Sequence, residues 1–333
     1  MSDAWLLISF ALGATVSLTA SWLLVTRLER IGARAGLSEA LLGMLAALAA
    51  DGPEITSAVT ATLGGHARIG AGVVIGSNVF NLAALLGLGS IVAGRIVLHR
   101  RVLLFEGTVA LLIAGITTAV VVGRLPAGAG LAVCALLLLL YVLVSSGPER
   151  QRWLPLGLRS WLARAVSEEE IELAGALDHT RARTRDVVVA VTMVLVVVGA
   201  SVAMEQTAST LGTRVGVSEI VVGGLVLAAV TSLPNAVSAI YLARRGRGAA
   251  TLSTALNSNA LNIAAGLLVP ATIIGLAPSS GGTTLVTLWY AGFTVIVLGL
   301  AIAGRGLRRG AGIAIVAGYV AFVLAVTLAG YTS

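Results

Sequence analysis

Long apolar runs alternate with short polar segments along nearly the whole chain. A helix needs about 20 mostly apolar residues to cross a bilayer, and ten windows of the sequence meet this condition. They are about 4–26, 37–63, 69–93, 102–123, 127–146, 187–204, 217–243, 249–275, 283–304 and 310–330. The pattern predicts an all-α polytopic membrane protein with ten transmembrane helices.

One long polar segment, residues 147–186, divides these spans into two groups of five. We therefore expect a first transmembrane half over residues 1–146 (spans 1–5), a cytosolic loop over 147–186, and a second half over 187–333 (spans 6–10).

Composition agrees with a membrane protein. Apolar residues make up 57% of the chain and charged residues 11%, whereas soluble domains are about 25% charged. So few polar residues could not cover a soluble core. The first apolar run follows Met1-Ser2-Asp3 and lacks both the basic start and the cleavage site of a signal peptide. We expect it to be retained as a span.

The net charge of +7 reflects membrane topology. All 22 basic residues are arginines, and they lie in short runs between apolar stretches, so we do not expect nucleic-acid binding. If the N-terminus is outside, 19 of the 22 fall in inner loops, as the positive-inside rule requires. The sequence thus predicts a multi-pass protein of the cell inner (plasma) membrane with its N-terminus outside.

The two groups of spans share a pattern of polar residues. Three elements of the first half have counterparts in the second, and the spacing from the proline to the last asparagine is 28 residues in both. The pairs are Leu37-Ser38-Glu39 with Val217-Ser218-Glu219, Pro53-Glu54 with Pro234-Asn235, and Ser77-Asn78-x-x-Asn81 with Ser258-Asn259-x-x-Asn262. Copies five spans apart have opposite orientations, which predicts two inverted five-helix repeats, as in secondary transporters.

Prolines in mid-span predict that helices 2 and 7 are broken. Pro53 and Pro234 each remove a backbone donor and clash with the preceding turn, so carbonyl oxygens should be freed beside polar side chains. Acids at mid-span cost roughly 2.5–3.5 kcal/mol on insertion scales, and these residues must therefore face protein or water.

The candidate metal ligands are the span residues that offer carboxylate, amide or hydroxyl oxygens. They are Glu54, Asp51, Ser77, Asn81, Thr231, Ser232, Asn235, Ser258 and Asn262. Such a donor set suits hard cations, among which Ca²⁺ takes six to eight oxygens. We expect no catalytic residue and no cofactor, since neither H-E-x-x-H nor a nucleophile–histidine pair occurs at span depth.

Structural explanations compete with ion binding at several positions. Proline kinks and Asn or Ser pairs often serve helix packing; this explanation is favoured for Asn78 and Asn259, whereas ion binding is favoured for Glu54. Asp51 has no acidic counterpart in the second copy, so both explanations stay open there.

The remaining polar residues have simpler interpretations. Glu39 and Glu219 begin their spans as helix-start residues. Glu106 can snorkel or pair with Arg100 and Arg101. We expect His66 and His99 to be solvated, and the single Cys134 to serve packing.

Four short segments resemble the signature repeats of the calcium/cation antiporter superfamily, of the sodium/calcium exchanger type. Residues 49–54 and 74–81 resemble the first repeat, written G-T-S-L-P-E and G-N-V-I-G-S-N-I-F-N, and residues 230–235 and 256–262 resemble the second. The resemblance implies a set of ion-lining residues, namely Glu54, Ser77, Asn81, Thr231, Ser232 and Ser258.

The sequence departs from that pattern in its acids. Ala50-Asp51 stands where the family has Thr-Ser, Asn235 where it usually has Glu, and Asn262 where several members have Asp. The two carboxylates therefore come from the first repeat. Their formal charge of −2 could neutralise one divalent or two monovalent cations.

These features together predict a secondary active cation antiporter that works by alternating access. We expect Ca²⁺ efflux in exchange for Na⁺ or H⁺, with inorganic cations and the lipid bilayer as partners; the oligomeric state stays open. The missing acids leave an alternative, a passive cation channel or a transport-inactive regulatory paralogue.

Overall fold

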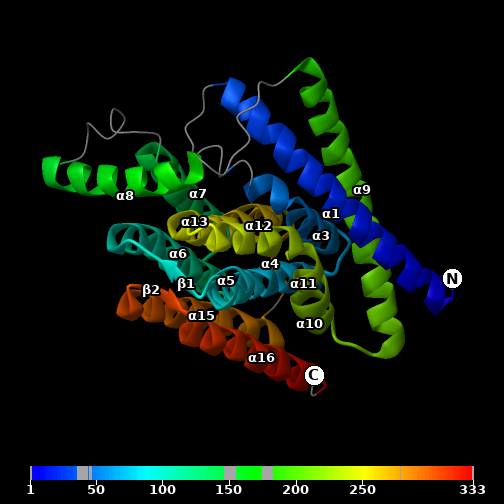
Figure 1. Cartoon of the computed structure of the whole chain (residues 1–333). Helices are drawn as coiled ribbons and strands as arrows, with labels where there is room; N and C mark the ends of the chain where they lie inside the picture. Colours follow the sequence, from blue (N-terminus) through cyan, green and yellow to red (C-terminus); the bar gives the residue numbers. More distant parts are fainter. Residues whose placement is uncertain are drawn as a thin grey trace.

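The computed structural model describes residues 2–35, 44, 47–145, 155–174, 183–277 and 279–331, and most of them are helical. The elements in chain order are α1 (Asp3–Arg34), α3 (Gly52–Leu63), α4 (Ala67–Asn81), η1 (Leu82–Leu88), α5 (Gly89–Ala93), β1 (Arg95–Val97), α6 (Arg100–Val121), α7 (Ala127–Ser145), α8 (Leu156–Ala174), α9 (Thr184–Val215), α10 (Glu219–Val221), η2 (Val222–Leu227), α11 (Ala228–Thr231), α12 (Leu233–Arg244), α13 (Gly248–Leu261), η3 (Asn262–Leu268), α14 (Val269–Ile274), α15 (Gly281–Gly304), β2 (Gly306–Arg308) and α16 (Arg309–Tyr331). Figure 1 shows α4 and α13 in the middle of the bundle, between the α1–α9 pair and the α15–α16 pair.

The two longest helices, α1 and α9, each have 32 residues and lie side by side in antiparallel orientation (Figure 1). Midway, Ser17 Oγ and Ser201 Oγ are 2.8 Å apart. At one end Arg214 Nη1 donates to Asp3 Oδ1 over 2.8 Å. We call this the Asp3 end of the bundle and the opposite one the Arg34 end.

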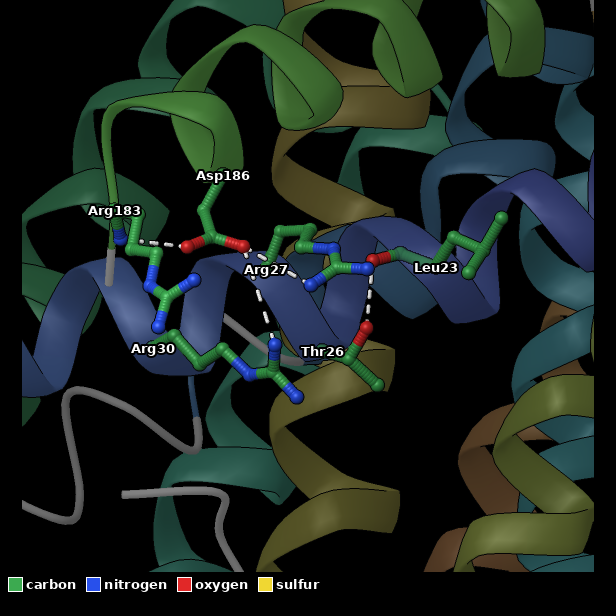
Figure 2. A network of polar contacts seen from close by, with 6 residues as sticks. All are labelled: Leu23, Thr26, Arg27, Arg30, Arg183 and Asp186. Atoms are coloured by element: carbon green, nitrogen blue, oxygen red, sulfur yellow. Dashed lines mark hydrogen bonds and ion pairs between the residues drawn. The ribbon is translucent and has the colours of Figure 1, made fainter. Parts of the chain in front are cut away.

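Polar contacts of Asp186 join the same two helices at the Arg34 end (Figure 2). Asp186 Oδ1 accepts from Arg27 Nη1 at 3.0 Å and lies 3.9 Å from Arg30 Nη1. Its Oδ2 accepts from the backbone N–H of Arg183 at 2.6 Å, which caps the first turn of α9. Thr26 donates within α1 to the carbonyl of Leu23. The antiparallel pair is therefore tied at both ends.

Eight helices of the described residues are long and apolar enough to cross a membrane, or nine if the bent α10–α12 pair counts as one span. The predicted window 37–63 lies partly outside the described residues, so the count of ten stays a prediction. The window 187–204 was too short, because α9 continues to Val215. Polar side chains in its last turns, such as Glu205 and Ser209, are buried against neighbouring helices, and hydropathy alone ended the span too early.

Both predicted proline breaks coincide with helix boundaries. Asp51 precedes α3, with Pro53 in its first turn. Ser232 separates α11 from α12, with Pro234 in the first turn of α12, and the two parts of this span are bent by 44°.

Two helices, α4 and α13, carry the repeated Ser-Asn-x-x-Asn segments, and we call them the motif helices. Both change from α-helical to π-helical geometry at equivalent places. After Asn81, α4 continues as the π-helix η1, and at Asn262 the helix α13 continues as the π-helix η3. π-Helical turns often occur at functional sites. Glycines bring α4 close to η2, since a Cβ on Gly72 would lie 2.9 Å from the backbone nitrogen of Gly224.

Two regions expected to be irregular contain regular structure. The predicted loop 147–186 contains α8, because Leu162 and Val166, four residues apart, pack with Val144 and Phe105. The all-α prediction also missed β1 and β2, which pair antiparallel with Ile96 opposite Leu307. Both of these apolar residues are buried, which explains the pairing.

Candidate cation site

The nine predicted ligands come from the two helix breaks and from the two motif helices, α4 and α13. All nine are fully or almost fully buried: Asp51, Glu54, Ser77, Asn81, Thr231, Ser232, Asn235, Ser258 and Asn262. Polar side chains this deep need partners, and the hydrogen bonds show which of them the fold brings together.

Asp51 connects the first half of the chain to the second. Its Oδ1 accepts from Ser258 Oγ and from Asn235 Nδ2, each at 2.6 Å. Asn235 Nδ2 also lies 3.2 Å from Ser258 Oγ. The carboxylate of the first break therefore lies against the second break and against α13.

Asn81 extends this cluster from α4. Its Nδ2 donates to Ser258 Oγ at 3.0 Å and to Asn259 Oδ1 at 3.1 Å. Because Asn81 donates through its nitrogen, its amide oxygen keeps its lone pairs for another partner.

Several buried oxygens in this region have no hydrogen-bond partner among the described residues. They are Glu54 Oε1, Glu54 Oε2, Asp51 Oδ2, Asn81 Oδ1, Asn262 Oδ1 and Ser232 Oγ. A buried polar atom without a partner costs about 1–3 kcal/mol, and more if it is charged. Buried oxygens of this kind are the atoms that a cation can satisfy, and oxygen donors with two carboxylates fit a hard ion.

Ser77 and Thr231 are buried in the same region but are bonded within their own helices. Ser77 Oγ donates to the carbonyl of Val74 at 3.0 Å, and Thr231 Oγ1 donates to that of Leu227 at 2.9 Å. Their hydroxyl oxygens still have lone pairs for a cation.

Asn78 and Asn259 join α4 to α13, as the packing explanation predicted. Asn78 Nδ2 donates to the carbonyl of Asn259 at 3.0 Å, and Asn259 Nδ2 donates back to that of Asn78 at 3.1 Å. Asn262 Nδ2 donates to Asn78 Oδ1 at 3.4 Å. These bonds fix the two motif helices relative to each other, and the structural prediction is confirmed.

Ser21 is a further buried polar residue near the first break, and it is not among the predicted ligands. Its Oγ donates to the carbonyl of Ala49 at 2.8 Å, just before the first break. Ser17 and Ser21 are four residues apart in an apolar span, a spacing that places both on one helix face. That spacing was the available signal.

The snorkelling interpretation of one charged residue was wrong. Glu106 does not snorkel: it is only 1% exposed and accepts from Tyr141 Oη at 2.8 Å, because α7 packs over it. His66, which was expected to be solvated, keeps 44% of its side chain exposed, and its Nδ1 lies 3.1 Å from Glu219 Oε1.

The other minor predictions have mixed outcomes. Glu219 does begin a helix, whereas Glu39 lies outside the described residues. Cys134 is buried in the core and His99 is exposed, as expected.

The described residues contain no group of three or more His, Cys, Asp or Glu side chains that could hold a metal ion. A cation at the helix breaks would therefore depend on Asp51 and Glu54 together with amide, hydroxyl and carbonyl oxygens. A site with only two charged ligands would allow a bound ion to dissociate again.

Comparison with known proteins identifies the family of the chain. The family model described as "Sodium/calcium exchanger protein" matches residues 5–146 and 186–328. CaxA of Alkalimonas amylolytica, named as an antiporter, is 36% identical over 83 residues, which are 25% of this chain and 26% of CaxA. The match thus spans about a quarter of that curated relative.

Solved structures share the fold. The sodium-calcium exchanger NCX_Mj superposes with a TM-score of 0.62 at 18% identity, covering 97% of this chain and 99% of the other. The H⁺/Ca²⁺ exchanger CAX gives a TM-score of 0.72 at 17% identity, covering 96% and 82%.

Proposed function

Since the chain belongs to the sodium/calcium exchanger protein family, we propose that it is a secondary active cation antiporter which exports Ca²⁺ in exchange for Na⁺ or H⁺. One observation carries the proposal. Both carboxylate oxygens of Glu54 are buried without a hydrogen-bond partner among the described residues, beside a helix break, in a chain built to span a membrane.

The nine polar residues of the two breaks and the two motif helices would form the ion site. With both acids ionised, Asp51 and Glu54 carry the charge of −2 that one Ca²⁺ neutralises. The uncharged oxygens of Asn81, Ser232 and Asn262 would complete the coordination.

Exchange requires that driver and substrate compete for the same oxygens. If two Na⁺ or two protons neutralise the carboxylates, Ca²⁺ must leave, and the reverse holds on the opposite face. Two inverted five-helix repeats would present this site to each side in turn, with the breaks before α3 and α12 at the midplane.

The two acids would contribute differently. Asp51 already accepts two hydrogen bonds through Oδ1, whereas Glu54 accepts none from the described residues. Glu54 therefore has more to gain from a cation or a proton. The related structures include both a Na⁺-coupled and a H⁺-coupled exchanger, so both drivers are to be tested.

The arginine distribution supports a plasma-membrane location with the Asp3 end outside and the segment 147–186 in the cytosol. The arginines of loops 95–101 and 244–247 would then lie on the cytosolic side.

The test is Ca²⁺ flux in proteoliposomes. Vesicles loaded with radioactive Ca²⁺ are given an inward Na⁺ gradient or an inward proton gradient, each separately, with the membrane potential clamped. We expect one gradient to drive Ca²⁺ release well above the rate without a gradient. Release that needs no counter-ion would support the passive channel instead, and no release would support the inactive paralogue.

A further inference from the structure

The antiparallel ribbon of β1 and β2 places two arginines directly opposite each other. Arg95 pairs with Arg308, and both residues are exposed. The residues between them and the ends of the ribbon, Ile96 and Leu307, face the protein and are buried. Like charges directly opposite each other destabilise a strand pair. This position therefore favours a bound anion that neutralises both guanidinium groups.

Further arginines surround this pair. Three short segments, residues 94–101, 244–248 and 304–309, contain arginines but no acidic residue. The exposed arginines of these segments are Arg95, Arg100, Arg244, Arg245, Arg305, Arg308 and Arg309. None of these seven forms an ion pair with an acid in the part of the chain that the structure describes. Their charge can therefore act on an anion from outside the protein.

Backbone contacts hold the three segments together. Arg95 Nη2 donates to the carbonyl of Arg305 at 3.4 Å. Arg309 Nε donates to a carbonyl of α5 at 3.1 Å, which leaves its two terminal nitrogens for another partner. The turn between α12 and α13 also touches β1, because a Cβ on Gly248 would clash with the carbonyl oxygen of Val97.

The backbone of Arg305 is unusual for an arginine. Its φ is +48°, in the left-handed region that favours glycine, and no other non-glycine residue of the described chain has a positive φ. Residues held in such conformations cluster at binding sites. At this position an arginine adds positive charge beside Arg95, which a glycine would not.

The arginines lie at the ends of membrane spans, where lipid headgroups are found. Four candidate spans begin or end at the ribbon (Figure 1), namely Ala67–Ala93, Arg100–Val121, Gly281–Gly304 and Arg309–Ala329. Apolar residues are exposed beside the charges. Val97, on the same face of β1 as Arg95, is 52% exposed, and Ile302 is 47% exposed. Positive charge next to apolar surface matches a phospholipid, which has a phosphate and acyl chains.

We propose that Arg95, Arg305 and Arg308 bind the phosphate of an anionic phospholipid, with Arg309 and the α12–α13 turn beside it. Guanidinium groups bind phosphate through paired hydrogen bonds, and basic pockets between membrane helices bind anionic headgroups. Because β1 belongs to the first half of the chain and β2 to the second, the bound headgroup links the two halves. The proposal does not depend on which ions the protein exchanges.

The test is phospholipid binding to the full-length protein in a neutral detergent, measured by native mass spectrometry. The probes are phosphatidylglycerol, whose headgroup is negative, and phosphatidylcholine, whose headgroup has no net charge. We expect the parent to bind phosphatidylglycerol more tightly. R95Q/R308Q should weaken this binding about 25-fold, because each arginine near an anionic headgroup contributes about fivefold.

R68Q/R124Q is the matched control. It also removes two exposed arginines, but from the opposite ends of the two spans that flank β1. Its affinity for phosphatidylglycerol should equal that of the parent. Equal losses in both double variants, equal binding of the two lipids by the parent, or a parental affinity in R95Q/R308Q would overturn the proposal.

Thermal melting shows whether the variants are folded. Without lipid, R95Q/R308Q should melt at the parental temperature or above, because the repulsion between the opposite arginines is removed. R305G is a second variant: glycine suits the left-handed backbone, so the fold should be kept while the affinity falls about fivefold. Phosphatidylglycerol should raise the melting temperature of the parent and of R68Q/R124Q, but not that of R95Q/R308Q.

Inorganic phosphate distinguishes a lipid headgroup from a free anion. Added in excess over the lipid, it should not displace phosphatidylglycerol, because it lacks the acyl chains that contact the apolar surface. Displacement would indicate a site for free phosphate and would overturn the assignment to a phospholipid. A parental affinity in R305G, measured on folded protein, would exclude Arg305 from the site.

Discussion

Asp51 Oδ1 and Asn235 Nδ2 lie 2.6 Å apart, although the two residues are 184 positions apart in the chain. The acid of the first half thus lies opposite the amide of the second. Both acidic candidate ligands, Asp51 and Glu54, come from the first half. This arrangement makes the contributions of individual residues testable.

Glu54→Gln should abolish Ca²⁺ exchange. Loss of one buried partner of an ion costs about 3–5 kcal/mol, which corresponds to a decrease in Ca²⁺ affinity of at least about 100-fold. The amide is isosteric and removes a costly buried charge, so the apo-protein should melt at the parental temperature or above. Flux and Ca²⁺-dependent melting check both parts, and near-normal flux would exclude Glu54 as a ligand.

Asp51→Ser combined with Asn235→Glu should retain more exchange than Asp51→Ser alone. Asn235 contacts Asp51 Oδ1 in the parent. A glutamate at position 235 can therefore supply, from the second half of the chain, the negative charge that Asp51→Ser removes. Separating the two acids should also weaken the dependence of transport on pH, because close acids favour protonation of one of them. Flux is measured against pH for the parent and both variants. If Asp51→Ser alone transports like the parent, Asp51 does not contribute to ion binding.

Ser258→Ala should lower Ca²⁺ affinity about tenfold while the protein stays folded. Ser258 donates to Asp51 Oδ1 and accepts from Asn81 and Asn235, and a hydrogen bond to a charged group contributes about 1.5–3 kcal/mol. Equilibrium Ca²⁺ binding gives the affinity.

Ser253→Ala is the control for that change. Ser253 lies on α13 as well but bonds to Asn257 rather than to Asp51. Equal losses in both variants would mean that the helix as a whole, and not the Ser258 hydroxyl, determines the affinity.

Single cysteines placed in 95–101 or 244–247 should resist an impermeant thiol reagent added outside intact cells. The background is Cys134→Ser, which removes the buried native thiol. A cysteine at Asp3 should be labelled under the same conditions. Labelling of the arginine loops from outside would refute the proposed orientation.

Features that depend on local composition could be predicted from the amino-acid sequence. Runs of about 20 apolar residues are sufficient to identify spans such as α15 and α16. Pro53 and Pro234 predict helix boundaries without any knowledge of the tertiary structure, because proline lacks a backbone N–H donor in every environment. The candidate ligands could also be recognised from the local sequence, since a polar residue in an apolar span needs protein or water around it.

Which polar side chains meet could not be predicted in this way, because it depends on the packing of distant helices. Ser258 bonds to Asp51 across 207 positions, and nothing in either segment indicates the other. Glu205 escaped notice because hydropathy ended its span too early. The snorkelling interpretation of Glu106 was wrong because its partner, Tyr141, lies on another helix. Hydropathy and helix breaks are properties of a short segment, whereas the pairing of buried charges depends on how distant helices pack.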